Sequence, residues 1–388
     1  MKNWKKIGAW FLTLTVAVAS LSVTAALLLA TMQISGSAES SARTEPVNVA
    51  IMDRYDMYMT NQVSAALEGV LEIEKVYWLS DADKVAPQPN QTYYGTTQDP
   101  ASLGWLLEAA AELLNGQDTL FTTDVQIPEG SEVCYYLDDT ILAITWKQAI
   151  DNCLYTVSEV KIADASQFRR FLSGGEYGSE IQLLTTEMAS SVNAVVASSG
   201  DFYANRRHGV IVYDGLVQRC HSRYLETCYI DDKGDMSFSY LGELPDAEAA
   251  QAYVDENNIR FSIAFGPVLV ENGVPRPRHE YSDYLLGSVD EDHSRIALCQ
   301  RDELHYFVVI AGQDSNYNCY RMITLAEFQK HVVEFGCKMA YTLDGGQTAT
   351  LVMNNKLMNR VSYDSERHIS DIIYFATAIP SSEQNNGE

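Results

Sequence analysis

The hydrophobic and polar residues divide the chain into one long apolar stretch near the N-terminus and a body of short alternating runs. The stretch from Ile7 to Met32 contains 26 residues and no charged side chain. As a helix rising ~1.5 Å per residue it would be about 39 Å long, which exceeds the ~30 Å hydrocarbon core of a bilayer. The pattern therefore predicts one tilted transmembrane helix within residues 1–34.

The charges that flank this stretch predict its orientation. Lys2, Lys5 and Lys6 precede it, and residues 1–34 contain no acid. Basic residues before a span favour a cytoplasmic N-terminus. We therefore expect a single-pass protein of the cell membrane whose main domain is extracytoplasmic, with a short cytoplasmic stub.

A cleaved signal peptide is the alternative reading of the same stretch. The residues Gly36-Ser37-Ala38 would suit a small-residue cleavage site. Signal peptides have apolar cores of about 7–15 residues, however, and this one is much longer. Both readings place the rest of the chain outside the cytoplasm.

Two segments separate this stretch from the main domain. Residues 35–46 are rich in Ser, Ala and Gly and read as a linker. Residues 47–130 read as a mostly helical membrane-proximal region, with helices at 48–72 and 101–114 and a proline-containing loop at 81–100. This region carries no catalytic signature.

From residue 131 the pattern changes to short runs rich in aromatic and β-branched residues, which are typical of strands. The predicted strands are Val133–Leu137, Ile141–Trp146, Tyr155–Ile162, Val192–Ala197, Val210–Tyr213, Met339–Leu343, Ala349–Met353 and Ile372–Ala376. Asp231–Asp235 reads as a hairpin turn.

Two helices interrupt these strands. Asp246 fits the N-cap of a helix ending at Asn257, and Thr324 with Glu327 fits the capping box of a helix ending at Phe335. The fold class predicted is α/β mixed (α+β), with a mixed sheet over residues 131–380. Residues 381–388 form a polar tail.

The net charge excludes some partners. The chain has 27 Lys and Arg against 52 Asp and Glu, a formal charge of −25. Nucleic-acid binding needs a basic surface, so nucleic acid is not an expected partner. Attachment to anionic lipid through a basic patch is equally disfavoured, which leaves the N-terminal helix as the expected contact with the membrane.

Seven cysteines, an odd number, lie outside the apolar stretch, and none has C-x-x-C spacing. Cys220 and Cys228 flank a predicted turn, so a disulfide between them and buried free thiols are both open. The seven histidines show no ligand spacing, so no metal site is predicted. Nucleotide-binding glycine loops, a G-x-S-x-G elbow and an H-E-x-x-H helix are also absent from the sequence.

Two segments place an acid and glycine together at the end of a predicted strand. They are Ala197–Tyr203, with Gly200 and Asp201, and Leu343–Thr348, with Asp344, Gly345 and Gly346. Glycine lets backbone N–H groups approach a ligand without a side chain in the way. Taken alone, the first segment is read better as a simple turn, and the second also fits a tight turn with a solvated Asp344.

Two further segments place an arginine near a strand. Arg295 follows the acidic run Asp290–Asp292, and Arg367 precedes the last predicted strand. Arg295 suits a bidentate anion clamp, although it could equally pair with the acids beside it.

Together with a fifth segment, and in this order, these segments resemble the phosphodiester glycosidase family over about residues 131–380. The matching stretches are Ser199-Gly-Asp-Phe-Tyr203, Phe265-Gly-Pro-Val-Leu-Val270 with Asn272-Gly273, Arg295-Ile-Ala-Leu-Cys299, Thr342-Leu-Asp-Gly-Gly-Gln-Thr-Ala349 and Glu366-Arg-His-Ile-Ser-Asp371. The sequence departs from the family pattern at Ser199, Ile296, Cys299, Thr342 and 347–349.

The resemblance implies a hydrolase that cleaves between a sugar C1 and a phosphodiester oxygen, as in an N-acetylglucosamine-1-phosphodiester, in cell-envelope or exogenous glycans. The partner would be a phosphorylated glycan or sugar-1-phosphodiester. The implied catalytic residues are Asp344, Asp201 and Arg295. The implied substrate-binding residues are Gly345, Gly346, Gly200, Tyr203, Arg206, Arg367 and Thr348.

No cofactor is expected; Ca²⁺ held by the same acids is an option that no ligand spacing indicates. The alternative function is a non-catalytic glycan-binding or exopolysaccharide-assembly protein on the same scaffold, which the departures from the family pattern motivate. A purely structural membrane-anchored spacer would leave the five co-occurring segments unexplained.

Overall fold

The computed structural model describes residues 79, 85–98, 104, 127–128, 130–281 and 289–379, all within one compact unit, residues 77–388. The predicted transmembrane helix, the linker, the helix at 48–72 and the polar tail lie outside the described residues, as does the helix at 101–114 apart from Gly104. Among the residues that are described, no helix is long and apolar enough to cross a membrane.

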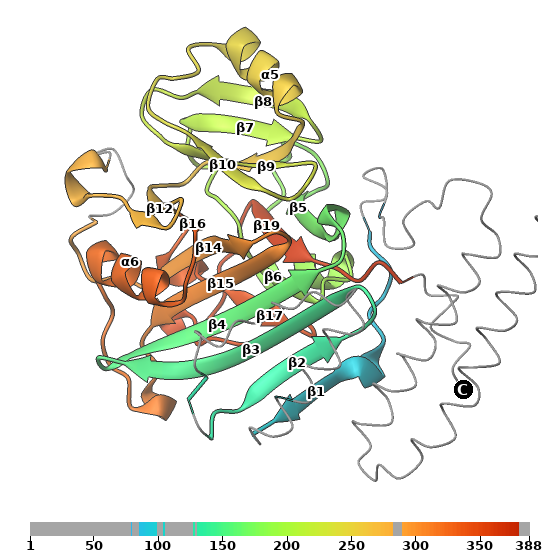
Figure 1. Cartoon of the computed structure of the whole chain (residues 1–388), viewed down its shortest axis with the longest axis vertical. Coiled ribbons are helices and arrows are strands. Elements are labelled where there is room, and N and C mark those ends of the chain that lie inside the picture. Colours follow the sequence, from blue (N-terminus) through green and yellow to red (C-terminus); the bar gives the residue numbers. More distant parts are fainter. Residues whose placement is uncertain are drawn as a thin grey trace, which may run out of the picture. The chain divides into compact units, whose positions relative to one another are not determined.

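A nine-stranded sheet forms the largest layer (Figure 1), in the order β1-β2-β3-β4-β15-β14-β16-β12-β13. Its strands are β1 (Tyr94–Thr97), β2 (Val133–Leu137), β3 (Ile141–Ile150), β4 (Cys153–Ile162), β15 (His305–Gly312), β14 (Arg295–Asp302), β16 (Met339–Thr342), β12 (Val268–Glu271) and β13 (Val274–Pro275).

Three smaller sheets complete the described strands. The five-stranded sheet comprises β18 (Lys356–Leu357), β17 (Leu351–Met353), β6 (Val196–Ser199), β19 (Asp371–Phe375) and β5 (Phe168–Leu172). The three-stranded sheet comprises β10 (Met236–Ser239), β9 (Thr227–Asp231) and β11 (Ile259–Ile263), and the two-stranded sheet β7 (Gly209–Tyr213) and β8 (Leu216–His221).

All the pairs recorded between these strands are antiparallel. The described part of the chain has three α-helices, α4 (Thr185–Ser191), α5 (Ala247–Glu256) and α6 (Leu325–Glu334). The predicted mixed domain is therefore confirmed as a sheet-rich domain with few helices, in which the sheets are antiparallel rather than mixed in direction.

Four hairpins turn through two residues that both have positive φ. Their loops are Asp151-Asn152, Asp214-Gly215, Asn272-Gly273 and Asn354-Asn355. Two-residue hairpin loops favour this left-handed geometry because it matches the twist of the paired strands, and Asn, Asp and Gly tolerate it best. The short polar interruptions in the sequence thus set the register of these hairpins.

The main hydrophobic core lies between the nine-stranded sheet and the smaller sheets. Alternate residues of β14, such as Ile296 and Leu298, pack there with Phe168 of β5 and Phe375 of β19. The rings of Phe168 and Phe375 are stacked, with centroids 4.7 Å apart. This packing fixes the five-stranded sheet against the large sheet.

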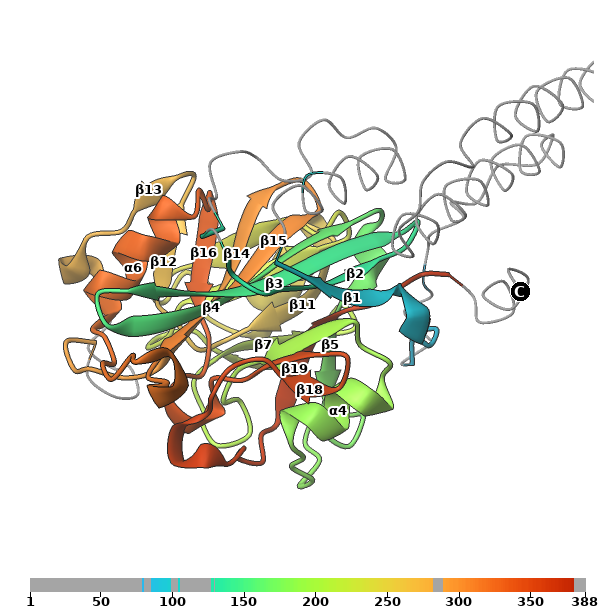
Figure 2. The ribbon, with the colours of Figure 1, turned by 90° about the horizontal axis from the view of Figure 1, so that it is seen from below.

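Each helix covers an outer surface of one sheet, as Figure 2 shows for α4 and α6. Met188 of α4 packs in a cluster with Ile372 and Tyr374 of β19, and Val254 of α5 packs with Val210 and Val212 of β7. Phe328 of α6 stacks near Tyr155 of β4, at 6.4 Å between ring centroids. All ten residues of β4 are buried because both faces of its sheet are covered.

The predicted caps of two helices are confirmed. The Asp246 side chain accepts a hydrogen bond from Ala249 N at the start of α5. Thr324 and Glu327 form the reciprocal capping box of α6, and Gly336 follows that helix with φ +76°. The hairpin turn at Asp231–Asp235 is also present, between β9 and β10.

One expectation was wrong. Residues 94–97 lie in the predicted loop but form β1, which pairs with the edge of the large sheet at β2. Of the two alternatives left open for Cys220 and Cys228, the structure has the free thiols: all seven cysteines are unbridged, and Cys228 is fully buried in the core.

We expect Thr324→Ala to destabilise the protein by about 1 kcal/mol, because the backbone N–H of Glu327 loses its capping acceptor. Urea unfolding measures the change. Lys330→Ala on the same helix is the control: its side chain is exposed and lies 3.8 Å from Glu334, and such surface pairs contribute little. Equal losses in both variants would contradict a capping role.

Candidate active site

The segments that the sequence analysis singled out meet at the ends of their strands. Asp344 N donates to Gly200 O at 3.3 Å, and Gly200 N donates to Asp371 O at 3.1 Å. Gly346 N donates to Ser294 O at 2.8 Å. These backbone bonds join the loop after β6, the turn after β16, the start of β14 and the start of β19, which are distant in sequence.

A cleft of about 300 Å³ opens where these segments meet. Its lining includes residues of all five segments, together with His293 and Ser294, which precede Arg295. The lining residues are Phe202, Phe265, His293, Ser294, Arg295, Ile296, Thr342, Leu343, Asp344, Gly345, Gly346 and Arg367. The cleft therefore combines one carboxyl group, two arginines and two aromatic rings, a composition suited to an anionic or sugar ligand.

Asp344 is the acidic residue of the cleft lining. Its side chain is buried, and its Oδ2 atom has no hydrogen-bond partner. Burial raises its pKa to about 6, opposed by Thr348, Arg367 and Arg206, while Asp201 adds to the rise. A carboxyl group that changes charge near neutral pH within a cleft is suited to proton transfer.

Two arginines supply positive charge near Asp344. The guanidinium of Arg367 is exposed and lies 5.1 Å from the centre of the Phe202 ring. Arg206 is buried, lies 4.7 Å from the Phe265 ring and donates from Nη1 to Phe265 O at 3.0 Å. Its Nη2 atom has no partner, and its burial lowers its pKa.

Further unpartnered polar atoms lie in these strand ends. Thr342 Oγ1, in the cleft lining, and Ser199 Oγ, at the end of β6, are buried without a hydrogen-bond partner. Buried polar groups are nearly always satisfied, and unsatisfied ones concentrate at sites that await a ligand or water. Both hydroxyls stand where the sequence departs from the phosphodiester glycosidase pattern.

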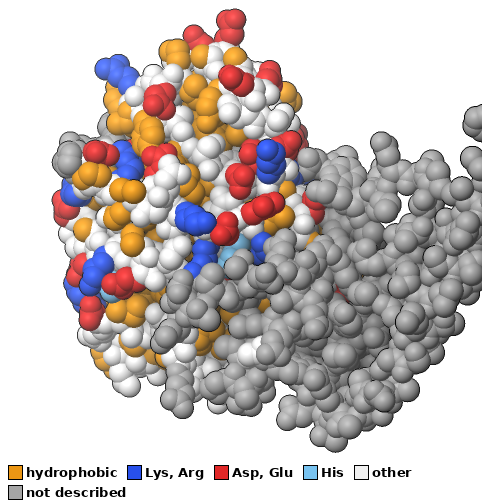
Figure 3. Space-filling model, in the orientation of Figure 1, with side chains coloured by type: hydrophobic (Ala, Val, Ile, Leu, Met, Phe, Trp, Pro, Cys, Tyr) orange, Lys and Arg blue, Asp and Glu red, His pale blue; other side chains and the backbone are white. Residues whose placement is uncertain are grey.

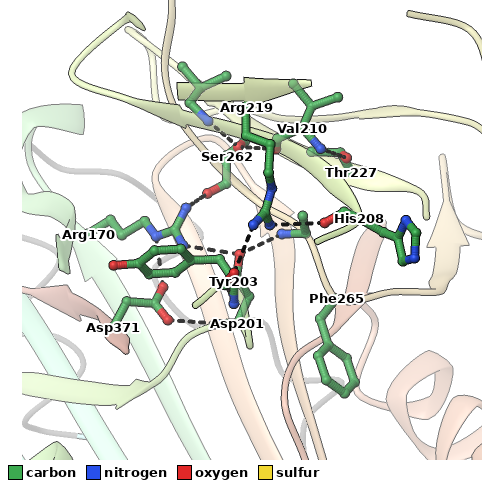
Figure 4. Close-up of polar contacts among 12 residues, drawn as sticks. Arg170, Asp201, Tyr203, His208, Val210, Arg219, Thr227, Ser262, Phe265 and Asp371 are labelled. Carbon is green, nitrogen blue, oxygen red and sulfur yellow. Dashed lines mark hydrogen bonds and ion pairs between the residues drawn. The ribbon is translucent and has the colours of Figure 1, made fainter. Parts of the chain in front are cut away.

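Asp201 lies in a different environment from Asp344 (Figure 4). Arg170 on β5 donates from Nη2 to Asp201 Oδ2 at 3.0 Å and from Nε to Asp371 Oδ2 at 2.7 Å, and all three side chains are fully buried. Asp201 also accepts from Tyr203 N at 2.6 Å and from Ala264 N at 2.8 Å. Its contacts therefore support a structural role, and it does not line the cleft.

The ion cluster also accounts for Gly200. A Cβ on this residue would lie 2.2 Å from Asp371 Oδ2, so a side chain would displace the carboxylate. Arg170 further donates from Nη1 to Ser262 O, which ties in β11. Burial alone would lower the pKa of Arg170, but the nearby Asp371 and Asp201 outweigh it and raise the pKa, so the guanidinium stays charged.

Several predicted substrate-binding residues instead shape the loops. Tyr203 is buried, and its ring stacks on Tyr177 at 5.5 Å, outside the cleft lining. Thr348 donates from Oγ1 to Gly345 O at 2.6 Å and closes the turn after β16. A Cβ on Gly345 would lie 2.6 Å from Ser294 O, so only glycine fits there.

Arg295 lines the cleft, but its guanidinium is anchored to the backbone. It donates from Nε to Ile323 O at 3.2 Å and from Nη2 to Glu291 O at 2.6 Å. Burial lowers its pKa to about 10, opposed by Asp292 and Glu291. Its orientation therefore depends on the loop before β14.

Some residues of the site were missed by the sequence analysis. Phe265 begins a quoted motif and Ser294 immediately precedes another, but neither was named as a site residue because its side chain carries no signal of its own. Arg170 lies in β5, a strand that was not predicted, and nothing local marks it as a partner of two distant carboxyl groups. Among the described residues, no group of three His, Cys, Asp or Glu could hold a metal ion.

Residues 192–376 match the family model of the phosphodiester glycosidases. The predicted resemblance is confirmed over this segment. The phosphodiester glycosidase segment contains all five quoted motif stretches, and it contains every residue that lines the cleft. None of the curated proteins matches the chain.

The solved structures similar to this one include the following three. The zebrafish N-acetylglucosamine-1-phosphodiester alpha-N-acetylglucosaminidase catalytic domain, auto-inhibited by its pro-peptide, is 18% identical, with a TM-score of 0.47 over 61% of this chain and 82% of that one. A hypothetical protein from Synechocystis is 13% identical (TM-score 0.48, 64% of each chain). An exported protein from Burkholderia pseudomallei K96243 is 12% identical (TM-score 0.41, 58% and 74%).

We expect Arg170→Met to destabilise the protein by about 3–5 kcal/mol, because it leaves two buried carboxyl groups without their cation. Arg170→Lys keeps the positive charge but cannot bond both carboxyl groups in the same geometry, so it should be less destabilised than Arg170→Met. Urea unfolding of both variants tests this. A loss below about 1 kcal/mol in Arg170→Met would contradict the role given to the cluster.

The raised pKa of Asp344 predicts a pH-dependent stability. The folded state favours the protonated form of the Asp344 carboxyl. The free energy of unfolding therefore falls as the pH rises from about 4 to about 6, and the loss is complete above that range. We expect Asp344→Asn to raise the free energy of unfolding at pH 8 by about 2–3 kcal/mol, and the gain to vanish below pH 4.

Thermal or urea unfolding across this pH range measures the effect. Asp364→Asn is the matched control, because Asp364 is exposed and its pKa is lowered by Arg360. That variant should show no gain at high pH. A pH-independent difference between the wild type and Asp344→Asn would refute the assigned titration.

Proposed function

We propose that the domain hydrolyses the bond between a sugar C1 and a phosphodiester oxygen. The family match supports a hydrolase of phosphodiester-linked sugars at a coarse level. The observation that carries the proposal is Asp344, a buried carboxyl group in the cleft with an unpartnered oxygen and a pKa of about 6. The substrate would resemble an N-acetylglucosamine-1-phosphodiester of a cell-envelope or exogenous glycan.

In the proposed step, Asp344 acts as its carboxylate. A water molecule attacks C1, the carboxylate takes a proton from that water, and the C1–O bond breaks with its electron pair leaving on the phosphate oxygen. A phosphate is already a good leaving group and needs little protonation. The larger requirement is to stabilise the positive charge that develops on the sugar, which a nearby carboxylate does.

The arginines would hold the departing phosphate. Arg367 is exposed in the cleft, and both Arg367 and Arg206 favour the ionised form of Asp344. Charge-assisted bonds from guanidinium groups suit phosphate oxygens. Because two of its donors already bind backbone carbonyls, we place Arg295 in a supporting position and Arg367 first.

Phe202 and Phe265 would contact the sugar face. Both rings line the cleft, and each also carries an arginine on its surface, Arg367 and Arg206 respectively. Each phenyl ring therefore lies beside a guanidinium group. A sugar ring could pack on the phenyl ring while its phosphate contacts the guanidinium. We assign no step to Asp201 and no step to a metal ion.

The cellular location is a further proposal. We place this domain outside the cytoplasm, anchored by residues 7–32, on the basis of the apolar stretch and its basic flank. The boundaries 1–34, 35–46, 47–130, 131–380 and 381–388 are proposed with it. Protease accessibility of the domain in intact cells and in permeabilised cells would test both orientation and anchoring.

The activity test follows free sugar release from UDP-N-acetylglucosamine and a panel of sugar-1-phosphodiesters. We expect Asp344→Asn to lower kcat/KM by about 10²–10⁴-fold, because the proton acceptor is lost. In the wild type, kcat/KM should fall below about pH 6 as Asp344 becomes protonated. Asp290→Asn, an exposed carboxyl paired with Arg278, is the control and should leave release unchanged.

Two outcomes would redirect the proposal. Release that persists in Asp344→Asn would move the chemistry to another group. No release from any substrate by the wild type, with glycan binding retained, would favour the non-catalytic glycan-binding function on the same scaffold.

A further inference from the structure

A cluster of basic side chains lies beside the cleft in a chain that is strongly acidic as a whole. Residues 203–224 contain four arginines and two histidines but a single acid, Asp214, against a net charge of −25 for the chain. We call these six side chains the basic strip: Arg206, Arg207, His208, Arg219, His221 and Arg223. Asp214 lies at the opposite end of β7, in the turn to β8.

The β7–β8 hairpin brings the members of the basic strip together. Gly209 pairs with His221, so the residues before β7 lie beside those at the end of β8. Arg219 donates from Nη2 to His208 O at 3.0 Å (Figure 4). Tyr224 connects the two ends further, since its ring lies 4.9 Å from the His208 ring and 5.2 Å from the Arg223 guanidinium.

Four of the six side chains in the basic strip have no acidic partner at ion-pair distance among the described residues, whereas the charges of Asp201 and Asp344 act on Arg206. Burial and the positive charges of Arg206, His221 and Arg219 all lower the pKa of His208. Arg207, Arg219, His221 and Arg223 form no ion pair with any described residue. By contrast, the face of the molecule in Figure 3 mixes acidic and basic side chains.

Two buried nitrogens in the basic strip also lack a hydrogen-bond partner. They are Arg206 Nη2 and Arg219 Nε. A buried guanidinium nitrogen without an acceptor costs free energy, so such atoms indicate a place where an anionic oxygen would be bound. The unpartnered nitrogens and the uncompensated charge are independent observations, and they indicate the same class of ligand.

The basic strip is continuous with the cleft. Arg206 lies against Phe265, which lines the cleft, and its charge acts on Asp344. Arg219 donates from Nη1 to Tyr203 O at 2.8 Å, one residue beyond Phe202 of the cleft lining. A ligand that leaves the cleft past Phe202 and Phe265 would therefore reach the arginines and histidines next.

We propose that the basic strip binds successive phosphate groups of a polyanionic glycan, on the side of the polymer next to the bond held in the cleft. This inference rests on the proposed hydrolysis of a sugar-phosphate bond and names its substrate class. A glycan joined through phosphodiesters carries one phosphate in each repeat, and guanidinium groups bind phosphate oxygens in pairs. The acidic remainder of the protein would repel the polymer everywhere else.

A glycan fits the basic strip better than a nucleic acid does. Single-stranded nucleic acids bind through a basic groove combined with aromatic rings that are open to base stacking. The ring of Tyr224 is instead in contact with His208 and Arg223. The strip therefore offers charge without an open stacking surface.

The test measures binding to the full-length protein by calorimetry at low and physiological salt. The probe is poly(glycerol phosphate) substituted with N-acetylglucosamine; dextran is the neutral comparison, and single-stranded DNA with the same number of phosphates is the second anion. The variant is Arg207→Gln/Arg223→Gln. Lys233→Gln/Lys356→Gln is the matched control, because both pairs are exposed and both lose two positive charges.

We expect the wild type to bind the phosphate polymer at least about tenfold more tightly than dextran, and the arginine variant to lose about tenfold in affinity. The lysine control should stay within about twofold. Equal losses in both variants, or no preference for the polymer over dextran, would overturn the proposal. DNA bound as tightly as the polymer would overturn the assignment to a glycan.

A separate measurement distinguishes failure of the proposed hydrolysis from failure of the proposed polymer binding. Sugar release from small sugar-1-phosphodiesters reports on Asp344 and does not depend on the polymer. If the arginine variant loses polymer binding but the wild type releases no sugar, the basic strip is a phosphate-binding site and the proposed hydrolysis is rejected. If the wild type releases sugar but does not bind the polymer, the hydrolysis is supported and the proposed role of the basic strip is rejected.

Discussion

One buried guanidinium holds together the part of the fold that forms the cleft. Arg170 on β5 contacts carboxylates from the loop after β6 and from the first residue of β19, and a backbone carbonyl of β11. A buried charge is costly unless it is paired and hydrogen-bonded, and here each of the three guanidinium nitrogens has an acceptor. The pairing forces these elements into one arrangement, because any displacement would leave a charge unpaired in the core.

The shape of the cleft follows from that arrangement. Asp371 approaches Gly200 so closely that only glycine fits, and Gly200 O accepts the backbone N–H of Asp344. The ion cluster thus positions the turn that carries Asp344 without contacting its carboxyl group. The two aspartates therefore differ in their surroundings. Asp201 accepts three hydrogen bonds, from Arg170, Tyr203 N and Ala264 N, whereas Asp344 has an oxygen without a partner and a raised pKa.

The distribution of charge over the chain restricts where an anionic substrate can bind. The chain is acidic overall, so an anionic substrate would be repelled at long range and would bind only where local cations outweigh that field. The arginines around the cleft and in the basic strip supply such a place. Arg206 belongs to both, since it contacts Phe265 and acts on the charge of Asp344, and it therefore joins the proposed reaction site to the proposed polymer site.

The sequence by itself determined the local features whose cause lies within a few residues. The caps at Asp246 and Thr324 and the strand Val133–Leu137 are of this kind, as are the short motifs that resemble the phosphodiester glycosidases, whose family model matches 192–376. The strand β5 was missed because Arg169 and Arg170 interrupt its apolar pattern. Both arginines are buried, and Arg170 finds carboxylate partners 31 and 201 residues away.

Only the tertiary structure could decide which of the candidate acids is structural and which is open to a ligand. Asp201 and Asp344 look alike in sequence, each at a strand end beside glycine. Their roles separate because folding delivers Arg170 to one and leaves the other in a cleft with Arg367. Long-range pairing sets the desolvation and the hydrogen bonding of a carboxyl group, and no local pattern encodes either.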